Sequence, residues 1–129
     1  MEIKYVKALV NKDSIRTLFE QINKTMPEGF EDFFKKYNGG RPTQNICFLY
    51  NGAEKVVNSF LSFNKDDKEN IYKAIKRVSQ NNLEIIPFAS DPAGNYFCIK
   101  SNEIVFYSHE DEEIYKISNS FNEFIDNLK

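Results

Sequence analysis

Residues 85–100 read Ile-Ile-Pro-Phe-Ala-Ser-Asp-Pro-Ala-Gly-Asn-Tyr-Phe-Cys-Ile-Lys. An apolar run stops at a polar turn and a second apolar run follows, which predicts a strand, a tight loop and another strand. In the loop, Pro92 fixes φ and Gly94 can adopt a positive φ. The side chains of Asp91 and Asn95 can bond nearby backbone groups. Such a loop could form part of an active site, or its polar residues could serve only to stabilise the turn. The functional question depends largely on which of these two roles the loop has.

The composition around this stretch is that of one globular domain with little net charge. The chain has 129 residues, 41% hydrophobic and 15% aromatic, which is enough for a single core over residues 1–129. Its 17 basic and 19 acidic residues give a net charge of −2, which gives no support to direct nucleic-acid binding. Residues 1–83 carry fourteen basic and ten acidic side chains, whereas residues 84–129 carry three and nine. The C-terminal third is therefore acidic.

The two cysteines and the apolar runs indicate the cellular setting. Cys47 and Cys98 each lie inside a strand-like apolar run, so we expect buried, reduced thiols and no disulfide framework. The sequence contains no apolar run of membrane-spanning length, and its N-terminus lacks the apolar segment of a signal peptide. We therefore expect a soluble, cytoplasmic protein that does not interact with a membrane.

Four segments carry apolar residues at positions i, i+3, i+4 and i+7. This spacing places them on one helical face and predicts four amphipathic helices. The four sets are Ile15, Leu18, Phe19 and Ile22; Phe30, Phe33, Phe34 and Tyr37; Ile71, Ala74, Ile75 and Val78; and Phe121, Phe124, Ile125 and Leu128.

Polar residues mark the expected starts of three of these helices. Asp13 is expected to cap the first helix, and Asp66 or Asp67 the third. Ser120 with Glu123 has the spacing of a capping box for the fourth.

The second helix is bounded by proline and glycine. Pro27 lies in the region before the helix where proline is tolerated. Asn-Gly-Gly at 38–40 is expected to end the helix, because glycine adopts the left-handed conformation at low cost, and Pro42 prevents its continuation.

Apolar and alternating runs between the helices predict short strands. They are expected at residues 3–9, 46–50, 56–63, 83–89, 96–100, 103–107 and 114–118. The resulting order predicts an α+β fold, in which an antiparallel or mixed sheet of about five to six strands is edged by four helices.

The residues needed for catalysis are sparse. The chain has one histidine, His109, and neither cysteine lies in a setting that would activate it. A metal-dependent hydrolase built from Asp91, His109 and Asp111 is the remaining enzymatic alternative, but one histidine makes a poor transition-metal site. The Asn-Gly-Gly sequence ends a helix where a phosphate-binding loop would begin one. We therefore expect no catalytic residue, no metal and no cofactor.

Four blocks in this sequence resemble the signatures of the SUKH superfamily, the Smi/Knr-type domain. They are an aromatic helix followed by Asn-Gly-Gly-x-Pro at 26–42, Ile-Pro-Phe-Ala with Asp and Gly-Asn at 86–95, a strand ending in His-Glu at 104–110, and Ile-Ser-x-Ser-Phe-x-Glu-Phe at 117–124. The blocks occur in the expected order. The residues that carry the likeness are Pro27, Asn38, Gly39, Gly40, Pro42, Pro87, Asp91, Gly94, Asn95 and Phe121.

The resemblance implies a role as well as an α+β fold. Bacterial members of the superfamily are immunity proteins that bind a cognate polymorphic or contact-dependent toxin, often a nuclease, and are not enzymes. A fungal branch acts as signalling scaffolds, so an intracellular regulatory adaptor is the alternative. The implied partner is thus a protein toxin. The chain is expected to be a monomer or a weak dimer. The polar residues of the loop at 91–95 are expected to stabilise the turn rather than to form an active site.

Charge indicates where such a partner would bind. A nuclease is basic where it holds nucleic acid, so an acidic face would accelerate association with it. The candidate contact residues are Glu103, Glu110, Asp111, Glu112 and Glu113. The alternatives are that these residues form an ordinary solvated loop, or that the loops at 43–45 or 51–55 make the contacts instead.

Overall fold

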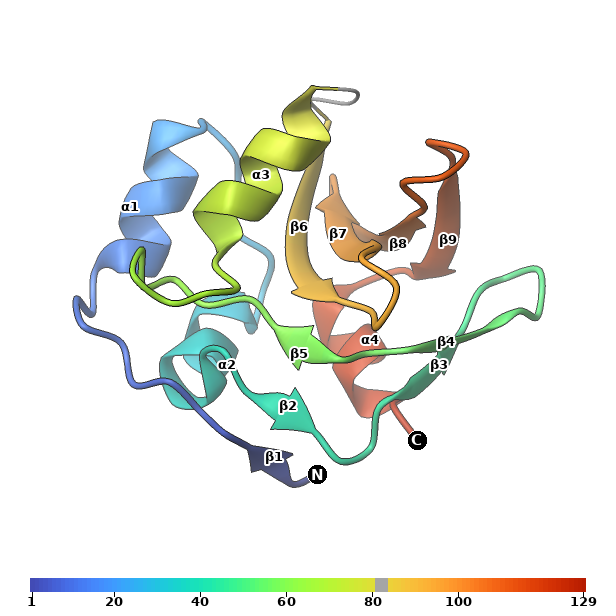
Figure 1. Ribbon diagram of the computed structural model, residues 1–129, viewed down its shortest axis with the longest axis horizontal. Coiled ribbons are helices and arrows are strands. Elements are labelled where there is room, and N and C mark those ends of the chain that lie inside the picture. Colours follow the sequence, from blue (N-terminus) through green and yellow to red (C-terminus); the bar gives the residue numbers. More distant parts are fainter. Residues whose placement is uncertain (81–83) are drawn as a thin grey trace.

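A curved antiparallel sheet forms the centre of the molecule. The computed structural model describes residues 1–80 and 84–129. The strand order is β5-β6-β7-β8-β9, and from β6 onward each strand pairs with the next along the chain (Figure 1). The strands are β5 (Ser59–Phe60), β6 (Ile85–Ser90), β7 (Tyr96–Lys100), β8 (Glu103–Tyr107) and β9 (Ile114–Ser118). The predicted α+β fold with an antiparallel meander is confirmed, although Leu83 of the expected strand 83–89 falls outside the described residues.

Two small strand pairs accompany this sheet. One pairs β1 (Ile3–Lys4) with β2 (Arg41–Pro42), and the other is a hairpin of β3 (Ile46–Phe48) and β4 (Glu54–Val56). In Figure 1 the hairpin reaches out on the β9 side of the sheet, away from the first three helices.

The sequence predicted longer strands at two of these places. The expected strand 3–9 ends after Lys4, because Tyr5 has a φ of 57° and the backbone N–H of Lys7 bonds the carbonyl of Asn38. The expected strand 56–63 is split in two. The N–H of Val57 bonds the hairpin at Asn45, whereas the next N–H bonds Ser90 of the central sheet. The chain therefore crosses from one sheet to the other at this point.

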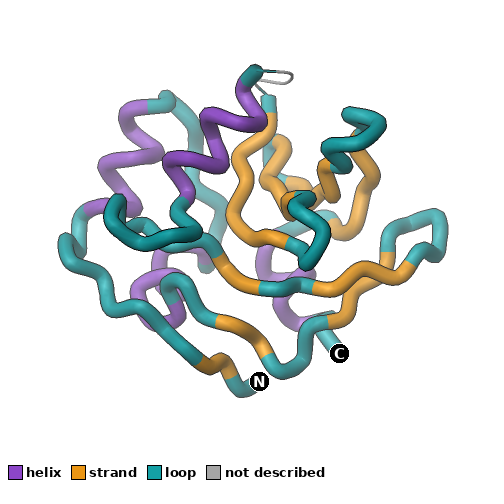
Figure 2. The backbone as a smooth tube through the Cα atoms, in the orientation of Figure 1, coloured by secondary structure: helices purple, strands orange, loops and turns teal. Residues whose placement is uncertain are grey.

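All four predicted helices are present. They are α1 (Ser14–Gln21), α2 (Phe30–Tyr37), α3 (Ile71–Ser79) and α4 (Phe121–Asp126). Helix α3 packs on β6, and α4 packs on β8 and β9. Figure 2 shows the long connection from β1 to α1 as a loop along the molecule's edge. Within the ranges 1–80 and 84–129, no helix combines the length and apolar character needed to cross a lipid bilayer.

One of the expected helix caps is confirmed only in its position and one is wrong. Asp13 is the N-cap residue of α1, but its side chain makes no capping bond. Asn70, not Asp66 or Asp67, caps α3 and accepts a bond from the N–H of Lys73 at 2.9 Å. Asp67 instead accepts from side chains of the preceding loop. Several polar residues precede α3, and local sequence does not decide which one reaches the free N–H groups.

The cap of α4 is confirmed in its main part. The hydroxyl of Ser120 accepts a bond from the N–H of Glu123 at 3.1 Å. The glutamate carboxylate reaches back to the N–H of Asn119 at 3.5 Å rather than to that of Ser120.

Phenylalanine rings build the core between α2, α4 and the sheet. Phe30 stacks on Phe34, with ring centroids 4.5 Å apart, and contacts Phe88 and Phe121 at 6.2 and 5.0 Å. All four rings are 1% exposed or less. Burial of this kind supplies most of the stabilisation of a small domain, roughly 1.5–3 kcal/mol for each side chain.

The end of α2 shows why Asn-Gly-Gly stands there. Gly39 has a φ of +69°, as expected for the residue that ends a helix. Gly40 is needed for another reason, because a Cβ at that position would lie 2.4 Å from the side chain of Ile3. Pro42 is buried and pairs with the same Ile3. These residues therefore dock the N-terminal strand on the helix.

Asn38 connects three segments from inside the protein. It is 1% exposed, and its Nδ2 donates to the carbonyl of Lys7 at 2.8 Å and to the hydroxyl of Ser62 at 3.1 Å. Its Oδ1 accepts from the N–H of Phe63 at 2.8 Å. The amide thus satisfies buried polar groups that would otherwise have no partner.

Prolines in the signature fit their positions. Pro87 lies in β6, pairs with Cys98 of β7 and stands at a register shift between the two strands, a place where a sheet tolerates proline. The carbonyl of Pro27 accepts from the N–H of Phe30 at 3.2 Å, which starts α2.

Candidate interaction surface

The loop between β6 and β7 is held by its own side chains. Asp91 Oδ1 accepts from the N–H groups of Ala93 and Asn95 at 3.0 and 2.7 Å. Its Oδ2 accepts from Asn95 Nδ2 at 3.0 Å. Gly94 has a φ of +87°, which is the conformation that favours glycine. Because both oxygens of Asp91 are engaged within the turn, the geometry favours turn chemistry over an active site.

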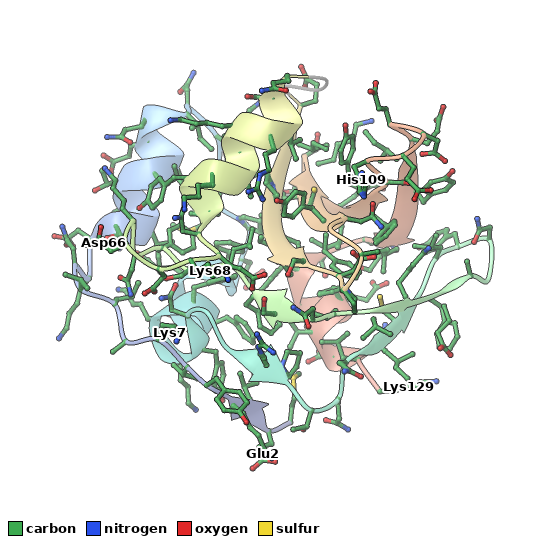
Figure 3. The ribbon with its side chains drawn as sticks, viewed as in Figure 1. Glu2, Lys7, Asp66, Lys68, His109 and Lys129 are labelled. Atoms are coloured by element: carbon green, nitrogen blue, oxygen red, sulfur yellow. The ribbon has the colours of Figure 1, made fainter. Side chains whose placement is uncertain are left out.

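This loop also fixes its neighbour, the loop between β8 and β9. Asn95 Oδ1 accepts from the N–H of His109 at 3.0 Å, and the imidazole Nε2 lies 3.1 Å from the carbonyl oxygen of Ala93. The histidine is thus placed as a bridge between two loops. Figure 3 shows it on the loop above β8 and β9.

We call residues 108–113 the acidic loop. Its backbone is closed by bonds from the N–H of Glu112 to the carbonyl of Ser108 and from the N–H of Ser108 to the carbonyl of Glu113, at 2.8 and 3.1 Å. The carboxylate of Asp111 accepts from the N–H of Glu113 at 2.9 Å and from the hydroxyl of Tyr115 at 2.8 Å. These two bonds hold the pKa of Asp111 below its usual value. Asp111 is therefore a structural member of the acidic loop.

The other three carboxylates of the acidic loop face solvent. Glu110, Glu112 and Glu113 are exposed, and no hydrogen bond or ion pair engages their side chains within residues 1–80 and 84–129. They stand on a backbone that is already ordered. Such groups are available to a partner without a large ordering cost.

Glu103 lies apart from the acidic loop. It begins β8, whereas the acidic loop follows the end of that strand, about 14 Å away at the usual rise per residue. Its carboxylate pairs with Lys116 at 2.6 Å, and this bond raises the pKa of the lysine. Of the five acidic residues predicted as contacts, the structure brings four together and places Glu103 with a neutralising partner.

A cleft of about 740 Å³ opens between α3 and the β6–β7 loop. Lys68, Lys73 and Arg77 line one wall, and Arg77 Nη1 donates to the hydroxyl of Tyr96 at 2.9 Å. The cleft thus sets cations beside the acidic loop. Apolar side chains such as Leu61 and Val78 line it as well, so the cleft is of mixed character.

The groups that could support catalysis are not assembled in the part of the chain that the structure describes. Within it, no three His, Cys, Asp or Glu side chains are grouped so that they could hold a metal ion. Burial raises the pKa of Cys47 to about 12 and that of Cys98 well above its usual value, so both thiols stay protonated. Asp91 and His109 are engaged in the turn and the loop bridge described above.

Sequence reasoning missed one exposed feature. The run 46–50 was expected to be a short apolar strand, yet Phe48 and Tyr50 are 45% and 62% exposed. The signal that could have revealed them is alternation, because Cys47 and Leu49 are the buried members of the same run.

Comparison with known proteins agrees with the fold and the signature residues. The profile of the SUKH_6 family, described as SMI1-KNR4 cell-wall, matches residues 12–125. The chain is 29% identical to the SPbeta prophage-derived uncharacterized protein YokK of Bacillus subtilis (strain 168), over 90% of this chain and 73% of that protein. It also resembles the crystal structure of a protein from Pseudomonas syringae pv. tomato, with a TM-score of 0.60, 13% identity, and coverage of 99% of this chain and 88% of that one. The protein therefore belongs to the SUKH (SMI1-KNR4) family, which is known from toxin-immunity systems.

Proposed function

We propose that this protein is an immunity protein, which binds a cognate toxin and neutralises it by protein–protein contact. The toxin is expected to be a nuclease with a basic surface. One observation carries the proposal. The acidic loop holds Glu110, Glu112 and Glu113 exposed and without intramolecular partners in the described residues, on a backbone fixed by internal bonds.

Electrostatics explains how such a loop would work. Exposed carboxylates attract a basic partner over several ångströms and raise the rate of association, by about ten- to a thousandfold in strongly steered complexes. A nuclease carries its positive charge where it binds phosphates. An acidic loop bound there would exclude the nucleic acid. The complex would form in the cytoplasm, where such a toxin meets its substrate.

Family membership and the state of the candidate catalytic groups support the same reading. The family is known from toxin-immunity systems. Both cysteine thiols are held protonated, and Asp91 is engaged by its own turn. A binding role requires neither a nucleophile nor a metal.

A regulatory scaffold is the second candidate. The description of the matched family profile refers to the cell wall, which favours a role in cell-wall control. The two roles differ in their genetic context, because an immunity gene is expected directly beside a large toxin gene.

Co-expression tests the proposal. The toxin domain encoded beside this gene is induced in a sensitive bacterial host, with and without this protein. We expect this protein to restore growth and to co-purify with the tagged toxin domain. If growth stays arrested and the two proteins elute separately, the immunity role is wrong and the scaffold becomes the leading candidate.

A further inference from the structure

The β3–β4 hairpin carries an apolar strip on its outer face. Along residues 46–50 the side chains alternate, with Cys47 and Leu49 only 4% and 5% exposed and Phe48 and Tyr50 turned to solvent. Val56 lies opposite Ile46 across the hairpin. The strip therefore consists of Ile46, Phe48, Tyr50 and Val56. Two exposed aromatic rings only two residues apart, one at the end of β3 and one in the turn that follows it, differ from the scattered single apolar residues of an ordinary surface.

The hairpin is held firmly in place. Backbone bonds in both directions join Ile46 to Lys129, at 3.1 and 3.0 Å, and the N–H of Tyr50 bonds the carbonyl of Lys116 in β9 at 3.0 Å. The turn is closed by a bond from the N–H of Leu49 to the carbonyl of Ala53 at 2.9 Å. Figure 3 shows Lys129 beneath the hairpin. A surface ordered in advance loses little conformational entropy when it binds.

Cations flank the two rings. Lys116 Nζ lies 5.1 Å from the centre of the Tyr50 ring, and Lys129 Nζ lies 6.0 Å from that of Phe48. The charge of Lys116 is balanced by Glu103. The ion pair of Lys116 and Glu103 therefore adds polar groups at the edge of the strip without adding net charge.

Strand β9 connects the strip with the acidic loop. Lys116, which bonds Tyr50, lies three residues after Glu113, about 10 Å along the strand. Between them the hydroxyl of Tyr115 bonds Asp111 of the acidic loop. The two features therefore occupy neighbouring parts of one side of the molecule. Apolar anchors with a charged rim are the usual anatomy of a protein interface.

We propose that Phe48 and Tyr50 are the apolar anchors of the partner interface, and that the acidic loop is its charged rim. The surface fits a basic protein that carries an apolar recess beside its lysines and arginines. This inference rests on the proposed function, because it takes the toxin as the partner. The charge of the adjoining acidic loop favours a basic protein over a second copy of this acidic chain.

The test measures binding of the purified toxin domain to single variants. Phe48→Ala and Tyr50→Ala are expected to raise Kd by about tenfold or more, chiefly through faster dissociation, as for aromatic anchors in other interfaces. Tyr50→Phe keeps the ring and is expected to keep the affinity. Tyr5→Ala is the matched control, because Tyr5 is 72% exposed on the N-terminal segment. The control is expected to change Kd by less than about twofold.

Each outcome separates the inference from the proposed function. If the unmodified protein binds the toxin and both alanine variants bind equally well, the strip is not the anchor, while the immunity role stands. If the unmodified protein does not bind the toxin, the proposed function fails and the inference falls with it. If sedimentation shows a dimer that Tyr50→Ala converts to a monomer, the strip is a contact between copies and the inference is overturned. Thermal unfolding of each variant identifies a loss of binding that results from misfolding.

Discussion

Two neighbouring loops at the same end of the sheet use their carboxylates in opposite ways. In the β6–β7 loop, both carboxylate oxygens of Asp91 accept hydrogen bonds from residues of the same turn. In the acidic loop, Glu110, Glu112 and Glu113 have no intramolecular partner in the described parts of the chain. The loops touch through the bridge from Asn95 to His109. The presence or absence of bonds within the loop therefore separates the carboxylate that stabilises the fold from those that we propose for partner binding.

The largest effect is expected from an inward-facing residue, Asn38. Asn38→Ala removes bonds to Lys7, Ser62 and Phe63 and leaves buried polar groups without partners. We expect the free energy of unfolding to fall by about 2–4 kcal/mol in urea titrations. Asn102→Ala, at an exposed turn position, is the control and should change it by less than about 0.5 kcal/mol. Equal, small effects of both substitutions would show that the buried amide does not stabilise the fold.

A smaller loss is expected in the β6–β7 loop itself. Gly94→Val places a β-branched residue at a φ of +87°, although the nearest atom to the new Cβ would be 3.7 Å away in His109. Backbone strain alone should therefore lower stability, by about 1–3 kcal/mol, seen as a lower Tm. Gly94→Asn should lose less, because asparagine tolerates this conformation. If Gly94→Val left the Tm unchanged and abolished partner binding, the loop would be functional.

The smallest effect concerns Asp111, the exposed member of the acidic loop whose carboxylate is bonded within the loop and to Tyr115. Its pKa is lowered first by the N–H of Glu113 and then by the hydroxyl of Tyr115. A carboxyl with a depressed pKa in the folded state stabilises the fold above the unfolded pKa of about 4, and this contribution is lost as the pH falls through the folded value.

Tyr115→Phe removes one of these donors. We expect the pKa of Asp111 to move back toward its ordinary value, which an NMR titration of the carboxyl resonance would measure. The loss of stability on acidification that this carboxyl causes should then be smaller, and it should be complete at a higher pH than in the unmodified protein. An unchanged titration would show that the hydroxyl does not hold this carboxylate.

The central fold could be predicted from sequence because its signals are local. Helical spacing and apolar runs located all four helices, and β7, β8 and β9 have the predicted bounds. The small strands could not be predicted in the same way. β2 has two residues, and its pairing depends on Ile3, which lies almost forty residues earlier in the chain. The capping role of Asn70 likewise depends on how the preceding loop packs.

The candidate surface was only partly visible in the sequence. The acidic loop is contiguous, so its residues are neighbours whatever the fold. The position of Glu103 was not evident, because it depends on the length and direction of β8. The exposure of Phe48 and Tyr50 was missed because a short apolar run looks the same whether one face or both are covered.

Charge reversal of the outward-facing carboxylates tests the contrast between the two loops most directly. The triple variant Glu110→Lys, Glu112→Lys and Glu113→Lys leaves Asp111 and its bonds in place. Its association rate with the toxin domain and its Tm are measured at low and high salt.

We predict that association slows by about tenfold or more at low salt, that its salt dependence weakens, and that the Tm changes by less than about 3 °C. An unchanged association rate, or a loss of stability comparable to that of Asn38→Ala, would contradict the assignment of these carboxylates to the binding surface.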